Sequence, residues 1–292
     1  MTRIVYVNGR YTPYADAAIH VEDRGFQFAD GVYEVCEVRD GSLVDERRHM
    51  RRLGRSLREL GMTEPVGLRS LGVILRETIR RNRVKNGLVY LQVTRGVARR
   101  DFAFPGPAVA PSIVCFARSL SPSKAEKRAA AGISVITVPD IRWKRVDIKT
   151  TGLLAQALAR QQAKEAGADE AWMVDGQGFV TEGASCNAWI VTGAGNVVTR
   201  PAESGILRGI TREVAMEAAR AKGLHLEERP FTVEEAKSAR EAFQTSASGL
   251  VVPVVKIDGH VIGSGRSGEI ALELRKIYHN IAEISPPHEL LA

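Results

Sequence analysis

The apolar pattern of this chain switches repeatedly between the period of a strand and the period of a helix, and this switching limits the fold more than any other feature. Alternating runs in the first part meet at Asn8-Gly9 and Asp40-Gly41, dipeptides that favour two-residue hairpin turns. Amphipathic runs alternate with these strands. The first part is expected to contain helices over 45–60 and 68–83 and further strands over 88–94 and 112–117.

The second part mixes the two patterns again, without an internal repeat. Its strands are expected over 133–138, 171–174, 179–181, 187–191 and 196–199, and its helices over 151–166, 211–222, 233–239 and 267–284. Between the two parts lies Ser119-Leu-Ser-Pro-Ser-Lys, a short polar segment typical of a linker. We expect an α+β protein with two domains, at 1–120 and 128–292, joined by a linker at 121–127.

Composition excludes several classes of protein. The chain has 292 residues, 44% of them hydrophobic and 26% charged, which is typical of a globular protein and not of a disordered or collagen-like one. No apolar run approaches the ~20 residues of a membrane span, and the N-terminus lacks the apolar region of a signal peptide. Cys36, Cys115 and Cys186 lie far apart, in settings typical of buried free thiols. We expect a cytoplasmic protein without a metal site.

The positive charge leaves several partners open. Lys plus Arg number 41 against 34 for Asp plus Glu, a formal charge of +7 that suits nucleic acid, an anionic membrane surface or small anions. Six arginines fall between Arg47 and Arg58 on one predicted helix. Because this helix also carries an apolar stripe and no interleaved aromatic residues, nucleic-acid binding is the weaker, non-enzyme alternative. Arg52 flanks the stripe, where it could reach inward to a phosphate.

Lysine is scarce, since it accounts for only ten of the 41 basic residues. Lys149 differs from the others because it closes a segment of mixed charge and large apolar residues just before a predicted helix. A lysine at the edge of an apolar body can be desolvated, which lowers its pKa and makes the amine a nucleophile. An ordinary lysine at a strand end is the alternative, and the residue pattern alone favours it.

Two further segments could contact a ring nitrogen and an anion. Glu182 precedes a run of small residues that lets a ligand approach the backbone, so its carboxylate could accept a hydrogen bond from a protonated ring nitrogen. Gly205-Ile-Leu-Arg-Gly-Ile-Thr-Arg opens a helix, whose free N–H groups could bind an anion. Taken singly, a turn glutamate and a simple N-cap are the favoured explanations. Motifs for nicotinamide cofactors and P-loops are absent.

Several short motifs follow one another along nearly the whole chain. They are Glu22-Asp-Arg-Gly-Phe-Gln-Phe-Ala-Asp-Gly-Val-Tyr-Glu-Val, His49-x-x-Arg52-Leu, Tyr90-Leu-Gln-Val-Thr-Arg-Gly, Asp147-Ile-Lys149, Thr181-Glu-Gly-Ala-Ser-x-Asn187 and Leu207-x-Gly-Ile-Thr-Arg212. In this order they resemble the class IV (fold type IV) pyridoxal-phosphate aminotransferases, most closely the D-amino-acid transaminases. The resemblance implies a small N-terminal α/β domain, a larger β-barrel-like C-terminal α/β domain that binds the cofactor, and a homodimer whose partner chain contributes to the substrate pocket.

The resemblance also implies roles for single residues. Lys149 would form the Schiff base with pyridoxal phosphate and shuttle a proton between the substrate α-carbon and C4′ of the cofactor. Glu182 would pair with the pyridinium nitrogen, and Leu207 would pack on the ring. The phosphate would be held by Arg52 and by the helix start at Ile210 and Thr211.

Substrate recognition departs from the pattern of the D-amino-acid branch. Tyr33 and Arg100 match residues that bind the substrate α-carboxylate there, but Phe102 stands where that branch has a histidine and cannot donate a hydrogen bond. Carboxylate binding is therefore expected to be weaker or to use Arg99 or Arg95. A pocket of this kind would also suit an (R)-selective amine transaminase, which stays open as an alternative.

A second departure lies near the phosphate. Ala247 replaces a threonine that binds phosphate in the family, Leu250 replaces a glutamate, and Ser246 or Ser248 could supply the lost hydroxyl. Leu154 stands where branched-chain aminotransferases commonly have tyrosine, which argues against that branch. An aminodeoxychorismate lyase also stays open. The expected reaction is a ping-pong transfer of an amino group between a D-amino acid and a 2-oxo acid.

Overall fold

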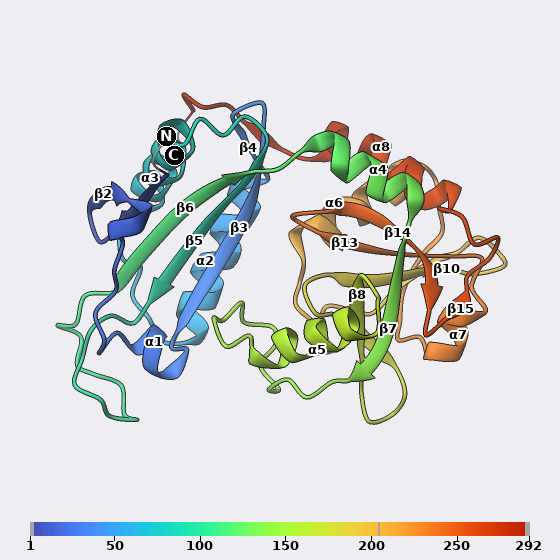
Figure 1. Ribbon diagram of the computed structural model, residues 1–292, viewed down its shortest axis with the longest axis horizontal. Coiled ribbons are helices and arrows are strands. Elements are labelled where there is room, and N and C mark those ends of the chain that lie inside the picture. The colour runs from blue at the N-terminus through green and yellow to red at the C-terminus, as the bar shows by residue number, and fades with distance from the viewer. Residues whose placement is uncertain (1–2, 204, 290–292) are drawn as a thin grey trace. The chain divides into compact units, whose positions relative to one another are not determined.

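The computed structural model describes residues 3–203 and 205–289, which form two compact units (Figure 1). Both units mix helices with strands, so the prediction of an α+β protein is confirmed. Unit 1 comprises Met1–Ser121, Ile148–Gly152 and Glu283–Ala292, and unit 2 comprises Pro122–Asp147 and Leu153–Ala282, with the undescribed residues left aside.

The division between the units falls close to the predicted linker at 121–127. Helix α4 (Pro122–Ala131) begins there, so most of that segment is helical. Proline suits the first turn of a helix because its missing N–H has no helical acceptor there. The returns of Ile148–Gly152 and of the last segment into unit 1 are absent from the predicted limits 1–120 and 128–292, since pairing with a distant strand leaves no local sequence signal.

A seven-stranded antiparallel sheet forms the body of unit 1, in the order β16-β4-β3-β5-β6-β1-β2. Its strands are β1 (Ile4–Val7), β2 (Arg10–Pro13), β3 (Gly31–Arg39), β4 (Ser42–Val44), β5 (Gly87–Thr94), β6 (Ser112–Ser119) and β16 (Ile284–Ser285). Its helices are α1 (Arg24–Phe28), α2 (Glu46–Glu59) and α3 (Leu68–Arg81), with a 3-10 turn at Tyr14–Asp16.

Both hairpin turns predicted in unit 1 are confirmed. Asn8 and Gly9 join β1 to β2 with φ angles of 44° and 90°, and Asp40 and Gly41 join β3 to β4 with 49° and 79°. Two successive positive φ angles match the right-handed twist of the flanking strands, and asparagine, aspartate and glycine tolerate them best.

The core of unit 1 lies between the sheet and helices α2 and α3 (Figure 1). Alternation along β3 turns Val32, Cys36 and Val38 into this core, against Met50 and Leu53 of α2. Glu34 falls on the same side of β3 and is 1% exposed. The helix–sheet contact of unit 1 therefore encloses one carboxylate among apolar side chains.

A nine-stranded sheet forms the body of unit 2, in the order β12-β11-β10-β13-β14-β7-β8-β9, with β15 paired to β14. Its strands are β7 (Ile133–Pro139), β8 (Glu170–Val174), β9 (Val180–Gly183), β10 (Asn187–Val191), β11 (Val197–Thr199), β12 (Leu226–Glu228), β13 (Glu241–Ser246), β14 (Leu250–Ile257) and β15 (His260–Val261). Besides α4, its helices are α5 (Leu154–Glu165), α6 (Ile210–Ala221), α7 (Val233–Lys237) and α8 (Glu269–Ile281).

Strand β10 is buried on both faces, which explains its continuous apolar run. On one face Trp189 stacks on Phe243 of β13 at 5.3 Å between ring centroids, in the core beneath α6 and α8. On the other face Ile190 joins the core around Trp172 and Phe231. The sheet of unit 2 thus lies between two apolar cores, one on each of its faces.

Most predicted helices occur within a few residues of the expected limits, but α5 begins at Leu154 and not at Thr151. The reason is that the preceding residues pair with β3: Thr151 N–H donates to the carbonyl of Gly31 at 3.0 Å. The three cysteines are buried and free, as predicted. Within the described residues, no helix combines the length and the apolar character that crossing a membrane requires.

Candidate active site

Lys149 lies in unit 1, on the short return that runs beside the start of β3. Its carbonyl accepts the N–H of Tyr33 at 3.0 Å, and its own N–H donates to Oγ of Ser56 on α2 at 3.4 Å. The neighbouring Thr150 bridges to Val32. Strand β3 and helix α2 thus fix the backbone of Lys149 from two sides, although Lys149 itself lies in no helix or strand.

The side chain of Lys149 is half-buried against an aromatic ring. Its Nζ lies 4.2 Å from the ring centroid of Tyr33, a cation–π distance. Tyr33 stacks on Tyr90 of β5, which stacks on Phe116 of β6, with centroids 5.4 and 4.8 Å apart. This aromatic row holds Tyr33 in place, so the Lys149 amine faces a fixed aromatic ring.

Arg52 of α2 is tied to Glu34 of β3 through two parallel hydrogen bonds. Its Nε and Nη2 donate to Oε1 and Oε2 of Glu34, each at 2.8 Å. Nδ1 of His49, one turn earlier on α2, lies 2.7 Å from Oε2 of the same carboxylate. Arg52 therefore reaches inward, as its helical position predicts, and Glu34 and His49 hold its planar fork.

The pKa of Glu34 follows from these contacts. Burial alone would raise it, but the charge and hydrogen bonds of Arg52, helped by His49, outweigh burial and lower the pKa of Glu34 to about 2. The carboxylate is therefore ionised throughout the neutral range. The pair is bidentate and buried, which is the strongest form of a carboxylate–guanidinium contact.

The loop after β5 carries Arg100 and Phe102, the residues predicted to contact substrate. Phe102 is 80% exposed, and its ring lies 5.6 Å from that of Phe28. The guanidinium of Arg100 lies 5.2 Å from the Phe28 ring. Buried Arg24 anchors the loop, because its Nη1 donates to the carbonyl of Asp101 at 2.6 Å.

Arg95, an expected substitute for the missing histidine, serves a different purpose. Its Nε donates to Asp30 at 2.7 Å, its Nη2 to the carbonyl of Leu60 at 2.8 Å and its Nη1 to that of Gly61 at 3.3 Å. Since all three nitrogens donate within unit 1, Arg95 supports the fold and is not placed to bind a carboxylate. Arg99 is exposed on the loop.

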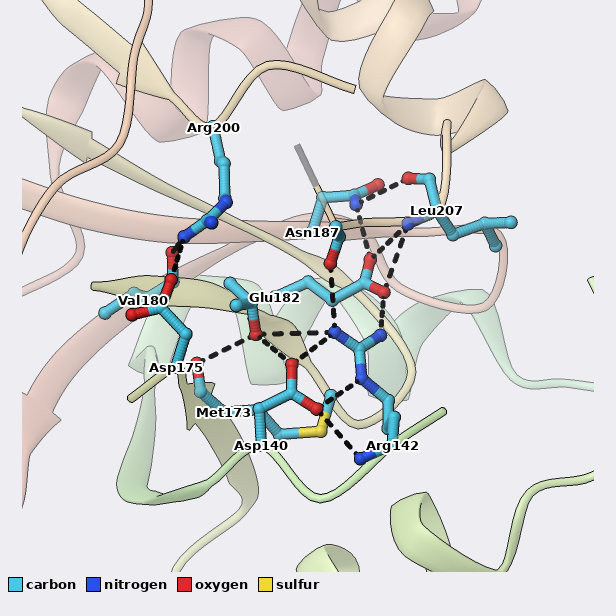
Figure 2. A network of polar contacts seen from close by, with 11 residues as sticks. Asp140, Arg142, Met173, Asp175, Val180, Glu182, Asn187, Arg200 and Leu207 are labelled. Carbon is cyan, nitrogen blue, oxygen red and sulfur yellow. Dashed lines mark hydrogen bonds and ion pairs between the residues drawn. The ribbon is translucent and has the colours of Figure 1, made fainter. Parts of the chain in front are cut away.

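Glu182 lies in unit 2, near the end of β9, where three residues converge on its carboxylate (Figure 2). Nδ2 of Asn187 donates to Oε2 at 2.9 Å, and the N–H of Leu207 donates to Oε1 and Oε2 at 3.1 and 3.2 Å. Nη1 of Arg142 contacts Oε1. Glu182 is 5% exposed, so one cationic and two neutral partners compensate its loss of water.

Arg142 is itself held by a second carboxylate (Figure 2). Its Nε and Nη2 donate to Oδ1 and Oδ2 of Asp140 at 2.9 and 2.6 Å, and Oγ1 of Thr181 donates to Oδ2 at 2.8 Å. Burial alone would raise the pKa of Asp140, but the hydrogen bonds and charge of Arg142, with Thr181, lower it. Asp140 and Glu182 thus face one guanidinium.

Leu207 and the start of α6 are positioned by Asn187. The Asn187 side chain donates to the Leu207 carbonyl at 3.0 Å while it also contacts Glu182. A Cβ at Gly209 would lie 2.0 Å from Oδ1 of Asn187, so only glycine fits there. Gly209 is the N-cap of α6, and no side chain caps the N–H groups of Ile210 and Thr211. This helix start can accept an anion.

The turn between β13 and β14 carries Ser246, Ala247 and Ser248, all in unit 2. Oγ of Ser246 accepts the N–H of Gly249 at 3.2 Å, which tightens the turn. Leu250, where a glutamate is expected from the resemblance, has a φ of 58°, a left-handed conformation that is uncommon for leucine. Helix α6 packs on β13 and β14, so the turn belongs to the same rigid unit as the helix start.

The predicted residues fall into two groups. Unit 1 holds Tyr33, Arg52, Arg100, Phe102 and Lys149, and unit 2 holds Glu182, Leu207, Ile210, Thr211, Ser246, Ala247 and Ser248. Motif reasoning did not single out Glu34, Asp140, Arg142 or Asn187 as site residues. For Asp140 and Arg142 the available signal was two opposite charges, two positions apart, soon after the predicted strand over 133–138.

Known proteins resemble this chain over almost its whole length. The family model for amino-transferase class IV matches residues 31–257. The D-alanine aminotransferase of Staphylococcus haemolyticus is 38% identical over 279 residues, which cover 96% of this chain and 98% of that protein. The D-alanine aminotransferase of Bacillus licheniformis is 38% identical over 277 residues, covering 94% and 96%.

Solved structures with the same fold include branched-chain aminotransferases. The T.th. branched-chain amino acid aminotransferase with pyridoxamine 5'-phosphate has a TM-score of 0.87 and 25% identity, over 96% of this chain and 94% of that one. The enzyme of Thermoproteus uzoniensis with norvaline has a TM-score of 0.84 and 27% identity, over 97% and 99%. The similarity therefore extends over both units.

Proposed function

The chain belongs to the class IV aminotransferases, and from this premise we propose that it transfers an amino group between a D-amino acid and a 2-oxo acid, with pyridoxal phosphate as cofactor. The predicted fold type IV is confirmed by the same comparisons. One structural observation carries the chemistry: Glu182 is a buried carboxylate held by one cationic and two neutral donors. The choice of D-amino acids is supported by relatives named D-alanine aminotransferase.

The residues present fit pyridoxal phosphate. A half-buried primary amine suits its aldehyde, and the buried Glu182 carboxylate suits its ring nitrogen. The uncapped N–H groups at the start of α6 suit its phosphate, with the Thr211 hydroxyl beside them. We propose that Arg52 and the turn at 246–248 add further phosphate contacts, with Ser246 or Ser248 in place of the hydroxyl absent at Ala247.

When bound, pyridoxal phosphate supplies an aldehyde that takes up amino groups and a ring that withdraws electrons from the substrate α-carbon. Lys149 would hold the cofactor through its amine, and the same amine would move the proton at the substrate α-carbon. Tyr33 keeps the lysine chain oriented by its ring. Glu182 would hold the proton on the ring nitrogen, and Leu207, whose backbone is tied to Glu182 and Asn187, would contact the ring.

Arg100 and Tyr33 are the proposed ligands of the substrate α-carboxylate. Phe102 contributes no hydrogen bond, so this chain has one donor fewer than the pattern of the D-amino-acid branch. We further propose a cytoplasmic homodimer, in which a partner chain adds to the substrate pocket. The 80% exposure of Phe102 supports such a contact, because large exposed aromatic side chains are enriched at interfaces.

A second candidate, an (R)-selective amine transaminase, is favoured by one observation only, the replacement of a hydrogen-bond donor by Phe102. An amine without a carboxylate has no need of the missing donor, whereas a D-amino acid must rely on Arg100 and Tyr33 alone. The two candidates therefore differ in the carboxylate of the donor.

A half-reaction panel tests the proposal. The protein is loaded with pyridoxal phosphate, mixed separately with D-alanine, L-leucine and (R)-1-phenylethylamine, and followed by visible absorption. D-Alanine is expected to convert the cofactor to the pyridoxamine form fastest. Fastest conversion by (R)-1-phenylethylamine would establish the second candidate, and conversion by L-leucine alone would contradict both. Lys149→Ala should abolish conversion, while Lys144→Ala, at an exposed lysine of the same segment, should not.

A further inference from the structure

The buried guanidinium of Arg142 lies between two carboxylates, one of which is the proposed ring contact (Figure 2). The exposed fractions of the side chains are 4% for Arg142, 7% for Glu182 and 12% for Asp140. Arg142 donates twice to Asp140 and contacts Glu182 through its remaining Nη1. Its Nη2 also donates to the carbonyl of Gly205, at 3.3 Å. The guanidinium therefore cannot turn without losing several bonds at once.

The charges of this cluster do not cancel. Two carboxylates and one guanidinium leave one net negative charge, and Asn187 and Leu207, which also donate to Glu182, are neutral. Arg142 alone would weaken the attraction of Glu182 for a cation, because its positive charge lies beside one of the two carboxylate oxygens. Asp140 restores the negative potential by neutralising Arg142 from the far side. The cluster therefore presents one net negative charge to a cation that faces Glu182.

We propose that Arg142 and Asp140 are positioning residues that set how strongly Glu182 holds a proton on the pyridine nitrogen of the bound cofactor; this inference rests on the proposed function. Arg142 fixes the direction of the Glu182 carboxylate, and Asp140 keeps the cluster at one net negative charge. Neither side chain needs to touch the cofactor for this effect, since a charge acts over several ångströms in a buried site. The electron-withdrawing strength of the ring would thereby depend on two residues that need not touch it.

The charge count predicts an ordered series of variants. Asp140→Asn leaves Glu182 and Arg142 with no net charge, so the ring nitrogen should lose its proton at a pH lower by about one unit, roughly a tenfold change in proton affinity. The double variant Asp140→Asn/Arg142→Met returns to one net negative charge and should restore the wild-type midpoint. Arg142→Met alone carries two negative charges and should raise the midpoint. Structural damage would instead accumulate in the double variant.

The test measures the ring nitrogen directly. Wild type and the three variants are loaded with pyridoxal phosphate carrying ¹⁵N in the ring, and the ¹⁵N chemical shift is followed against pH. Asp175→Asn is the matched control, because Asp175 pairs with Arg200 in the same unit, at 2.8 Å, and not with Arg142. Its midpoint should stay at the wild-type value.

Each outcome decides one claim. A lowered midpoint in Asp140→Asn that the double variant restores supports the inference, whereas an unchanged midpoint, or a further fall in the double variant, overturns it. If Asp140→Asn does not fold, the midpoint of Arg142→Met against that of the double variant measures the same charge, and equal midpoints overturn the inference. A wild-type protein that takes up no pyridoxal phosphate would instead contradict the proposed function itself.

Discussion

Unit 1 buries Glu34 against Arg52 and unit 2 buries Glu182 against Arg142, yet these two clusters are built for different tasks. In unit 1, Glu34 receives both bonds of the Arg52 fork and a contact from His49, all from one helix. In unit 2, Glu182 receives contacts from Arg142, Asn187 and Leu207, and Asp140 receives both bonds of the Arg142 fork. The first cluster joins helix α2 to strand β3. The second fixes a carboxylate whose charge is only partly neutralised.

The net charge makes the same distinction. Glu34 and Arg52 cancel each other, so their pair serves the fold and the orientation of Arg52. Glu182, Arg142 and Asp140 keep one negative charge in a buried place, which a protonated ring nitrogen would neutralise. The two glutamates are similarly buried, and they differ in whether the arginine fork binds the glutamate itself or another carboxylate.

The largest expected effect comes from Glu34→Gln. This change leaves the buried guanidinium of Arg52 without its counter-ion, and we expect the free energy of unfolding in urea to fall by about 3–5 kcal/mol. Glu77→Gln is the control, because Glu77 also binds two arginines, Arg80 and Arg81, but on the surface of α3. Its contacts lower the pKa of Glu77 to about 2, yet solvent screening should keep the loss below about 1 kcal/mol. Equal losses would show that burial does not distinguish these clusters.

The acid side of the stability curve gives the next effect. The pKa of Glu34 is about 2 in the folded protein against an ordinary 4.5, so its contribution to stability is complete above pH 4.5 and disappears as the pH falls toward 2. It amounts to about 3 kcal/mol. Urea unfolding between pH 5 and 2 should show this loss in wild type. The slope should be smaller in Glu34→Gln, and parallel curves would contradict the assignment.

The counterpart in unit 2 is Glu182→Gln. Arg142 keeps Asp140 as its partner, so unfolding should change by only about 1 kcal/mol. The half-reaction with D-alanine should slow by about 100-fold, because a neutral amide cannot hold the proton of the ring nitrogen. Stopped-flow absorption measures this rate. A normal rate combined with a large loss of stability would reverse the contrast between the two glutamates.

The smallest effect is expected for Arg52→Lys. Lysine keeps the charge but not the planar fork that Glu34 holds, so the proposed phosphate contact should lose its direction. We expect the Kd for pyridoxal phosphate, measured by quenching of protein fluorescence, to rise about tenfold, or about 1.4 kcal/mol. Arg51→Lys, at an exposed position on the same helix, is the control. An unchanged Kd would mean that Arg52 only ties α2 to the sheet.

Local patterns sufficed for much of the fold. The turns at Asn8-Gly9 and Asp40-Gly41, and the helices α2, α3, α6 and α8, occur where hairpin dipeptides and apolar periodicity predict them. Helix α1, strand β13 and the pairing of the Lys149 segment with β3 were not predicted. Short elements carry too few residues for a period to emerge, and pairing across a hundred residues has no local signal.

The candidate site shows the same division. Motifs could name Lys149, Glu182 and Arg52, because their chemistry and spacing are visible in the sequence. They could not name Asp140 or Arg142, because the contact of Arg142 with Glu182 and its bond to Asp140 form in a loop after β7 and leave no local signal. The exclusion of Arg95 as a substrate ligand also required the structure, since its three bonds to Asp30, Leu60 and Gly61 are long-range.

The central claim is that Lys149 carries the cofactor. Borohydride reduction of the loaded protein, followed by proteolysis and mass spectrometry, tests it most directly, because reduction makes the bond between lysine and cofactor permanent. The account predicts a phosphopyridoxyl group on the peptide that contains Lys149 and its loss when D-alanine is added before the borohydride. A label on another lysine, such as Lys144, or no label at all would contradict it.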